Sequence, residues 1–348
     1  MSSLTACGGT AMFRGNPMHT AMAESSGPEQ LNRLAWKFSA PDKVYSSPIV
    51  EGDTVYVGCK DGYLYALDLK DGRMKWKFKT GGNIESAVAV KGDTVLAGSW
   101  DGYLYAIDTD EQTLKWKFRT GGNVYSSPTI EDGIVYFGSE DNKLYAVDID
   151  TGFEKWHFDA KAGVYTSPAV FEDTVYIGTL DGYLRAINKV SGQEQWKFPT
   201  RSRIYSSPTI NGMHVYFGSD SKYVYAVDMK TGQQLWRKKT AGKVFSSVAV
   251  FEEGVFLGSA DSYIYAYDRK TGNRRWEYKT GGAIYSSPTI DGESIYIAST
   301  DGTLYVLGLE KGNLRWKYKV DDKIYSSPVI ADGKVVFSTV GGEVFAVE

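Results

Sequence analysis

Eight of the nine tryptophans stand at intervals of 40 residues, and this period constrains the fold more than any other feature. They occupy positions 36, 76, 116, 156, 196, 236, 276 and 316. Eight units of 40 residues account for 320 of the 348 positions and leave 28 at the N-terminus. A fixed period over the whole chain indicates one repeat array, natural or designed, and leaves no room for a separate catalytic domain.

Each unit contains four short runs rich in β-branched and aromatic residues, separated by Gly, Asp and Asn. In the first unit these runs are Val44–Pro48, Thr54–Gly58, Asp61–Asp68 and Lys75–Phe78. No window of useful length has a helical period. The sequence predicts an all-β fold, a single eight-bladed β-propeller with four antiparallel strands per blade. A three-stranded β-solenoid is the structural alternative.

The two ends of the chain complement each other. The first tryptophan precedes the first complete unit, and the last unit stops at Glu348 without one. We therefore expect a lead-in segment, residues 1–33, and a propeller, residues 34–348, in which residues 34–39 complete the last blade, 324–348. Pairing of these segments would close the ring and remove an exposed sheet edge.

Composition excludes several functional classes. The chain is 42% hydrophobic and 23% charged, with a net charge of −3, so it has no basic field that would attract nucleic acid or an anionic membrane. Two cysteines and three histidines provide neither a disulfide framework nor a zinc site. No apolar run is long enough to span a bilayer. We expect a monomer with no metal and no nucleic-acid partner.

A second motif links each tryptophan to the preceding strand. It reads Ala66, Asp68, Gly72 and Trp76 in the first unit and returns in most others. This motif resembles the tryptophan-docking propellers of the pyrroloquinoline-quinone (PQQ) type, and the resemblance covers residues 34–348. The WD40 alternative fails because its glycine-histidine signature has no counterpart.

The resemblance has departures and implications. Gln112 replaces the motif glycine, Asn188 replaces the aspartate, and Gly308 stands where the last aspartate belongs. The character is closest to the non-enzymatic, BamB-like branch, which implies an accessory of outer-membrane protein assembly or a related cell-envelope complex. Residues 13–20 also resemble the lead-in of that family.

No catalytic constellation is visible. The histidines lie outside any nucleophile context, and the Gly-Gly sequences link strand to strand without a following helix. The quinone enzymes of the family are longer, with a cofactor cover, adjacent cysteines and a calcium site. We therefore expect no catalytic residues and no cofactor, and favour a protein-interaction scaffold over a PQQ-dependent dehydrogenase.

The positions at which the residue differs from repeat to repeat are the candidates for binding a partner. The hairpin position at residue 60 varies in every blade, on the same face as the interblade loops. Apolar and basic residues gather there, and such residues are common at binding hot spots. The predicted partner-binding residues are Trp100, Glu140, Leu180, Lys161, Arg201, Arg203 and Lys243, with Lys222 in the same basic arc. Should this face fail, the acidic opposite rim around Glu131, Asp132, Glu172, Asp173, Glu252 and Glu253 is the next candidate.

Two further positions stand apart. Glu85 replaces a tyrosine or phenylalanine found in every other unit, near the expected channel mouth. It is the possible channel ligand of an alternative function, a small-ligand or glycan binder, and could hold a cation or a basic side chain or be hydrated. Cys7 follows Leu4-Thr5-Ala6 in a lipobox-like pattern, although only three residues, Met-Ser-Ser, precede that pattern. Cys7 is a possible lipid attachment, which favours the periplasm or cell envelope over the cytoplasm.

Overall fold

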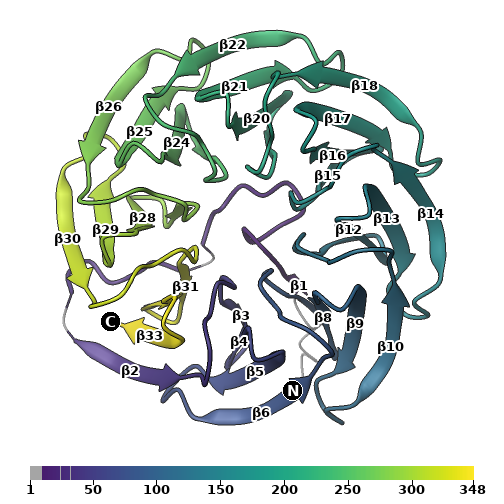
Figure 1. The fold of residues 1–348 in the computed structure, drawn as a ribbon. Helices are drawn as coiled ribbons and strands as arrows, with labels where there is room; N and C mark the ends of the chain where they lie inside the picture. The colour runs from purple at the N-terminus through teal and green to yellow at the C-terminus, as the bar shows by residue number, and fades with distance from the viewer. Residues whose placement is uncertain (1–9, 24, 32) are drawn as a thin grey trace, which may run out of the picture.

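The computed structural model describes residues 10–23, 25–31 and 33–348. These residues form 33 strands, arranged as eight sheets around a central axis (Figure 1). The predicted eight-bladed propeller is confirmed. Within the described residues, no helix is long and apolar enough to cross a membrane.

Seven blades take their strands from consecutive segments, ordered from the axis outwards. Blade 1 comprises β3 (Ile49–Glu51), β4 (Thr54–Gly58), β5 (Tyr63–Asp68) and β6 (Met74–Lys79). Blade 2 comprises β7 (Ala89–Lys91), β8 (Thr94–Gly98), β9 (Tyr103–Asp108) and β10 (Leu114–Arg119). Blade 3 comprises β11 (Thr129–Glu131), β12 (Ile134–Gly138), β13 (Lys143–Asp148) and β14 (Glu154–Asp159). Blade 4 comprises β15 (Ala169–Phe171), β16 (Thr174–Gly178), β17 (Tyr183–Asn188) and β18 (Glu194–Pro199).

The remaining blades follow the same plan until the last. Blade 5 comprises β19 (Thr209–Asn211), β20 (His214–Ser219), β21 (Tyr223–Asp228) and β22 (Gln234–Lys239). Blade 6 comprises β23 (Ala249–Phe251), β24 (Gly254–Gly258), β25 (Tyr263–Asp268) and β26 (Arg274–Lys279). Blade 7 comprises β27 (Thr289–Ile290), β28 (Ser294–Ser299), β29 (Thr303–Gly308) and β30 (Leu314–Lys319). Blade 8 comprises β31 (Val329–Ala331), β32 (Lys334–Ser338), β33 (Glu343–Val347) and β2 (Leu34–Ser39).

Burial explains the composition of each strand. The second strand is buried on both faces, as in β4, because each blade packs between two neighbours. The outermost strand alternates instead, and β6 buries Trp76 while Lys75 and Lys77 face solvent. The hydrophobic core is therefore a series of clusters between adjacent blades.

Closure of the ring follows the prediction. β2 pairs antiparallel with β33, from Leu34 opposite Val347 to Ser39 opposite Glu343. Blade 8 thus contains both ends of the propeller, and its outer edge is completed by the strand that precedes blade 1 (Figure 1).

The lead-in segment, of which residues 10–23, 25–31 and 33 are described, crosses the centre of the ring (Figure 1). Its strand β1 (Thr10–Ala11) pairs with β7 and gives that sheet five strands, one more than predicted. The sequence analysis did not anticipate this role. The segment covers inner-strand edges that would otherwise leave backbone groups without partners.

Two buried side chains anchor the lead-in segment. Arg14 donates to the carbonyls of Ser247 and Val248 in blade 6. The His19 ring lies 3.0 Å from the Pro208 carbonyl through Nδ1. Burial, with a smaller contribution from nearby Arg14, lowers the pKa of His19 to about 3, so the neutral ring donates through Nδ1.

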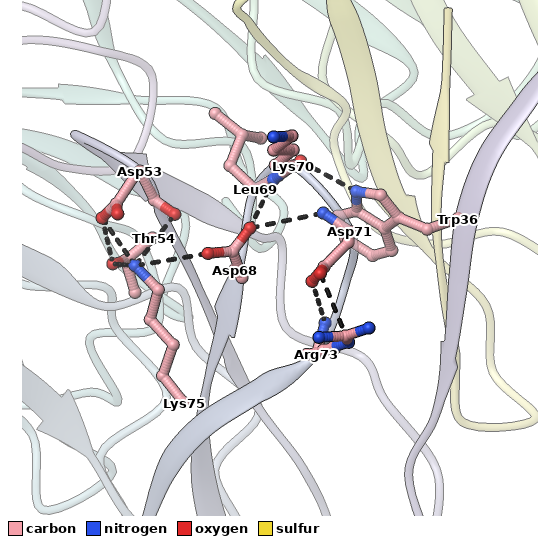
Figure 2. Close-up of polar contacts among 9 residues, drawn as sticks. All are labelled: Trp36, Asp53, Thr54, Asp68, Leu69, Lys70, Asp71, Arg73 and Lys75. Carbon is pink, nitrogen blue, oxygen red and sulfur yellow. Dashed lines mark hydrogen bonds and ion pairs between the residues drawn. The ribbon is translucent and has the colours of Figure 1, made fainter.

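The docking tryptophans join neighbouring blades as predicted. The Trp36 indole N–H donates to the carbonyl of Leu69 in the next blade at 2.8 Å (Figure 2). The Asp68 carboxylate shapes the receiving turn by accepting from the Lys70 N–H at 2.8 Å. Gly72 allows the close approach, since its φ is +74° and a Cβ there would lie 2.6 Å from the Trp36 ring.

The last tryptophan of the array has a different acceptor. Five other indoles donate to the carbonyl 33 residues onward, at Ile149, Lys189, Met229, Arg269 and Leu309. For Trp316 that position would lie beyond the last residue, and its N–H donates to Pro28 at 3.0 Å instead. The lead-in segment, which precedes β2 of blade 8, thus supplies the acceptor that the turn before the outer strand supplies in those five blades.

Trp76 docks where Gln112 replaces the motif glycine. Gln112 keeps the left-handed conformation of that glycine, with φ of +58°. Among the described residues, the Trp76 indole makes no hydrogen bond to the Thr109 carbonyl, the acceptor expected from the repeat. In the described part of the chain, this interface therefore lacks a hydrogen bond that the other docking tryptophans make, although Trp76 is buried in the hydrophobic core.

We expect Gln112→Gly to raise the free energy of unfolding by about 1 kcal/mol, because it removes the strain of a left-handed non-glycine residue. The matched reversal, Gly152→Gln, should lower it by about 2 kcal/mol, since strain is joined by overpacking against Trp116. Chemical denaturation followed by tryptophan fluorescence measures both. A destabilised Gln112→Gly variant would contradict this account of the motif.

Candidate functional site

The variable hairpins and the interblade loops share one face, here called the hairpin face. The backbone N–H of Trp100 donates to the Asn83 carbonyl, and that of Glu140 donates to the Asn123 carbonyl, both at 2.9 Å. Equivalent bonds join the hairpin residue to the loop in the other blades. The structure therefore places the predicted column beside the loops, as strand alternation indicated.

Seven aromatic rings line the channel mouth on this face and form the aromatic belt. Neighbouring rings contact one another, with centroid distances from 4.5 Å between Tyr125 and Tyr165 to 6.0 Å between Tyr165 and Tyr205. The belt consists of Tyr45, Tyr125, Tyr165, Tyr205, Phe245, Tyr285 and Tyr325. It surrounds a cavity of about 200 Å³ whose lining includes Phe13 of the lead-in segment.

A ring of serines lies next to the belt in the same cavity. Each serine hydroxyl accepts the backbone N–H of the equivalent residue one blade earlier, as when Ser127 donates to Ser167 at 3.1 Å. The same bond continues around the ring to Ser327, which donates to Ser47 at 2.9 Å. Ala87 has no hydroxyl, so blade 2 cannot accept this bond. The Ser-Ser-Pro repeat thus links blades around the axis as well as fitting the narrow channel.

Glu85 interrupts the aromatic belt, and Lys60 fills the gap. The Lys60 ammonium lies 3.4 Å from the Glu85 carboxylate and over the rings of Tyr45 and Trp100, at 5.6 Å and 5.3 Å. The Trp100 ring in turn lies 4.8 Å from Tyr125. The sequence left Glu85 to hold a cation, to hold a basic side chain or to be hydrated. In the structure, the basic side chain of Lys60 from the same chain lies beside it. Sequence reasoning gave Lys60 no such role.

The environment of Glu85 opposes ionisation. Burial raises the pKa of Glu85, and the charge of Lys60 acts in the opposite direction. The carboxylate and the ammonium are both partly buried, so their interaction is less screened than that of an exposed pair.

Several predicted partner-binding residues contact the aromatic belt. Glu140 accepts a hydrogen bond from the Tyr165 hydroxyl at 2.8 Å, and Lys243 lies over Phe245 at 5.8 Å. Leu180 is partly exposed and bonds the Gly163 carbonyl through its N–H. The belt therefore connects hairpins that are far apart in the sequence.

Ion pairs within the chain reduce the number of unpaired cations in the basic arc, which consists of Lys161, Arg201, Arg203, Lys222 and Lys243. Lys161 pairs with Asp159 at 2.6 Å, and Lys243 pairs with Asp220 at 2.9 Å. Arg201, Arg203 and Lys222 are exposed, and none of them has an ion pair within the described residues. Within the basic arc, these three cations carry the positive charge that remains unpaired.

The other candidate positions are placed as follows. Opposite-rim carboxylates are partly neutralised, because Asp132 pairs with Lys189 and Glu253 contacts Arg269 and Lys270. Cys7 lies outside the described residues. Cys59 is a buried free thiol, and burial raises its pKa to about 12.

The channel mouth does not fit pyrroloquinoline quinone. Three carboxylates on that cofactor need cationic or metal partners. Lys60 already pairs with Glu85 and Lys243 with Asp220, which leaves Arg203, whose guanidinium lies 3.5 Å from the Tyr205 hydroxyl, as the unpaired cation in contact with the aromatic belt among the described residues. In the described part of the chain, no group of three or more His, Cys, Asp or Glu side chains could hold a metal ion. Aromatic rings, serines and one carboxylate make up most of the remaining lining.

Two family models match the chain. One, described as "Beta-alanine-activating enzyme, beta-propeller", matches residues 29–230, and the other, "Outer membrane protein assembly factor BamB", matches residues 260–348. The chain belongs to the PQQ-type β-propeller family. The resemblance inferred from the docking motif is therefore confirmed.

Solved structures share the fold of this PQQ-type propeller. The computationally designed protein Ika8 is 18% identical with a TM-score of 0.82, and the match covers 91% of this chain and 99% of that one. BamB from Moraxella catarrhalis is 16% identical with a TM-score of 0.77, at the same two coverages. The quinohemoprotein alcohol dehydrogenase ADHIIG from Pseudomonas putida HK5 is 16% identical with a TM-score of 0.83, covering 97% of this chain and 79% of that one. No curated protein matches the chain.

We expect Lys60→Met to raise the pKa of Glu85 further, because burial then acts without the opposing charge. A carboxyl whose pKa rises on folding destabilises the protein as pH increases through that pKa. The variant should therefore lose stability with rising pH relative to Lys60→Met combined with Glu85→Gln. Carboxyl carbon NMR and pH-dependent melting measure the two effects. An unchanged Glu85 pKa would show that Lys60 does not stabilise the carboxylate.

Proposed function

We propose that the chain is a non-enzymatic protein-interaction scaffold, similar in role to BamB and located in the periplasm or cell envelope. The match of its C-terminal blades to the family of an outer-membrane assembly factor supports this proposal. The same fold also serves alcohol dehydrogenases, so the fold by itself does not decide the function. Cys7 remains the proposed lipid attachment site.

The observation that carries the proposal is the arrangement of the hairpin face. Variable hairpin residues adjoin the aromatic belt, with Trp100 against Tyr125 and Glu140 bonded to Tyr165. Aromatic anchors beside unpaired cations favour a partner segment with apolar and acidic groups. In this proposal, Trp100 and Leu180 contact the apolar groups of the partner, while Arg201 and Arg203 pair with its carboxylates.

Trp100 has a structural contribution as well. Its ring contacts both Tyr125 and Lys60, and its indole N–H is buried without a hydrogen-bond partner. Truncation at Trp100 would therefore disturb the channel mouth together with any partner contact. The exposed arginines provide the cleaner test.

We expect the double variant Arg201→Glu with Arg203→Glu to weaken partner capture at least tenfold while its melting temperature stays close to that of the parent. Charge reversal slows encounter and adds repulsion, whereas exposed side chains contribute little to folding. Cross-linked pull-down from envelope extract identifies the partner, and titration at low and high salt then measures its affinity. The loss should shrink at high salt.

A matched control carries the same charge change elsewhere. Lys70→Glu with Lys230→Glu alters two exposed residues in turns at the other ends of the strands. Equal weakening by both double variants would mean that net charge alone matters, and no weakening by the arginine pair would remove the hairpin face from the proposal. The acidic opposite rim would then be tested next.

A second candidate function is binding of a small ligand or glycan at the channel mouth. The aromatic belt and the serines that line the same cavity favour it, since aromatic walls with converging polar groups are common in ligand sites. A thermal-shift screen of soluble glycans separates this candidate from the scaffold, because stabilisation by a glycan requires no protein partner.

The scaffold proposal also makes a prediction about catalysis. Adding pyrroloquinoline quinone and calcium should produce neither saturable quinone binding nor dye-linked alcohol oxidation, because Lys60 pairs with Glu85 in the mouth. Equilibrium dialysis and a dye-reduction assay measure these outcomes. Stoichiometric binding with turnover would replace the scaffold proposal with a dehydrogenase.

A further inference from the structure

A second cavity, of about 500 Å³, lies on the side of the ring opposite the hairpin face. It is bounded by the lead-in segment and by the innermost strands of blades 8 and 1, β31 and β3. Its lining is largely apolar and includes Met12, Phe13, Met22, Val50 and Val329. It shares Phe13, Ser47 and Ser327 with the channel-mouth cavity, and its other lining residues belong to neither the hairpin face nor the mouth.

The inner strands present backbone groups towards the axis. In blade 7 the Ile290 N–H donates to the Ala21 carbonyl at 2.9 Å, and the Ile290 carbonyl accepts the Ala23 N–H at 2.8 Å. Ile290 pairs with Ile295 in the sheet, and the equivalent residues of the other inner strands have the same register. Their N–H and carbonyl groups therefore also face the channel.

Blades 4 and 5 show how a peptide meets these groups. Two successive lead-in carbonyls, of Pro17 and Met18, accept the N–H groups of Val170 and Ile210 at 2.8 Å and 2.9 Å. The next residue, His19, donates from its ring to the Pro208 carbonyl at 3.0 Å. One β-turn, closed by the His19 N–H donating to the Asn16 carbonyl at 2.9 Å, thus joins two adjacent blades.

The same three positions recur four blades further round the ring, at the second cavity. Ile330, Val50 and Pro48 are the repeat equivalents of Val170, Ile210 and Pro208. Within the described residues, the N–H groups of Ile330 and Val50 have no lead-in acceptor. Val50 is partly exposed, whereas Ile210 is buried.

We propose that this cavity binds a turn-forming peptide segment of a partner. Two successive peptide carbonyls accept the N–H groups of Ile330 and Val50, and a following side-chain donor reaches the Pro48 carbonyl. The lead-in segment identifies the chemistry of the occupant, because it makes these bonds at the equivalent positions of blades 4 and 5. Apolar peptide side chains pack against Met12 and Met22.

Hydrogen exchange of four backbone amides tests the proposal on the unmodified protein. The Ile330 and Val50 amides should exchange faster than those of Val170 and Ile210, which serve as matched controls. The probe is the acetylated and amidated peptide Asn-Pro-Met-His-Thr-Ala-Met-Ala, the sequence of residues 16–23. At saturation it should slow exchange at Ile330 and Val50 at least tenfold and leave the control amides unchanged.

Two variants test the hydrogen bonds directly. Val50→Pro and Ile330→Pro each remove one N–H at an inner edge, where proline is tolerated. Each should weaken peptide binding by roughly three- to tenfold, the usual value of one hydrogen bond. Circular dichroism verifies folding. If either variant fails to fold, the hydrogen-exchange measurement on the parent protein still tests whether the peptide binds at these two amides.

Several results would overturn the proposal. These are absence of peptide binding, binding without slower exchange at both amides, or full affinity in folded proline variants. Exchange at Val50 and Ile330 that is already as slow as at the control amides would also overturn it, because those groups would then have partners within the chain. Binding that appears only after residues 1–9 are deleted would assign the cavity to the chain's own N-terminus instead of a partner.

Discussion

Pairing of β2 with β33 is the interaction on which the rest of the structure depends, because it converts a linear repeat into a ring. Each blade packs between two neighbours, so an open array would leave two blades with an apolar face exposed to water. Closure also changes a local contact at the join. Trp316 docks on blade 8, whose outer strand β2 comes from the other end of the propeller, so the lead-in segment before β2 supplies the Pro28 carbonyl as its acceptor.

A ring of eight similar blades creates a second constraint at its axis. Eight inner strands direct backbone groups into a narrow channel. The lead-in segment forms backbone hydrogen bonds with only some of these strands. It bonds blades 2, 4, 5 and 7 through its backbone and reaches blade 6 through Arg14. The repeat symmetry is therefore broken by one segment, and the inner edges of blades 8 and 1 border a cavity instead.

Electrostatics on the hairpin face depends on neighbours more than on composition. Pairing with Asp159 and Asp220 reduces the field that Lys161 and Lys243 present to a partner, while Arg201 and Arg203 keep theirs. At the mouth, Lys60 joins Glu85, Tyr45 and Trp100 in one partly buried cluster. Glu85, which departs from the aromatic position of the repeat, thus pairs with Lys60 of the variable hairpin column. This pair joins the channel mouth and the hairpins into one surface.

The sequence by itself determined the blade number, the strand order, the closure by residues 34–39 and the tryptophan docking. These follow from period and local pattern, because every unit repeats the same short-range pairing. Only the tertiary structure decided the partner of Glu85, the pairing of Lys243 with Asp220, and the path of the lead-in segment. Those contacts join residues from different blades or from a segment without a repeat, such as His19 with Pro208, and no spacing in the sequence encodes them. Closing the ring is what brings them together.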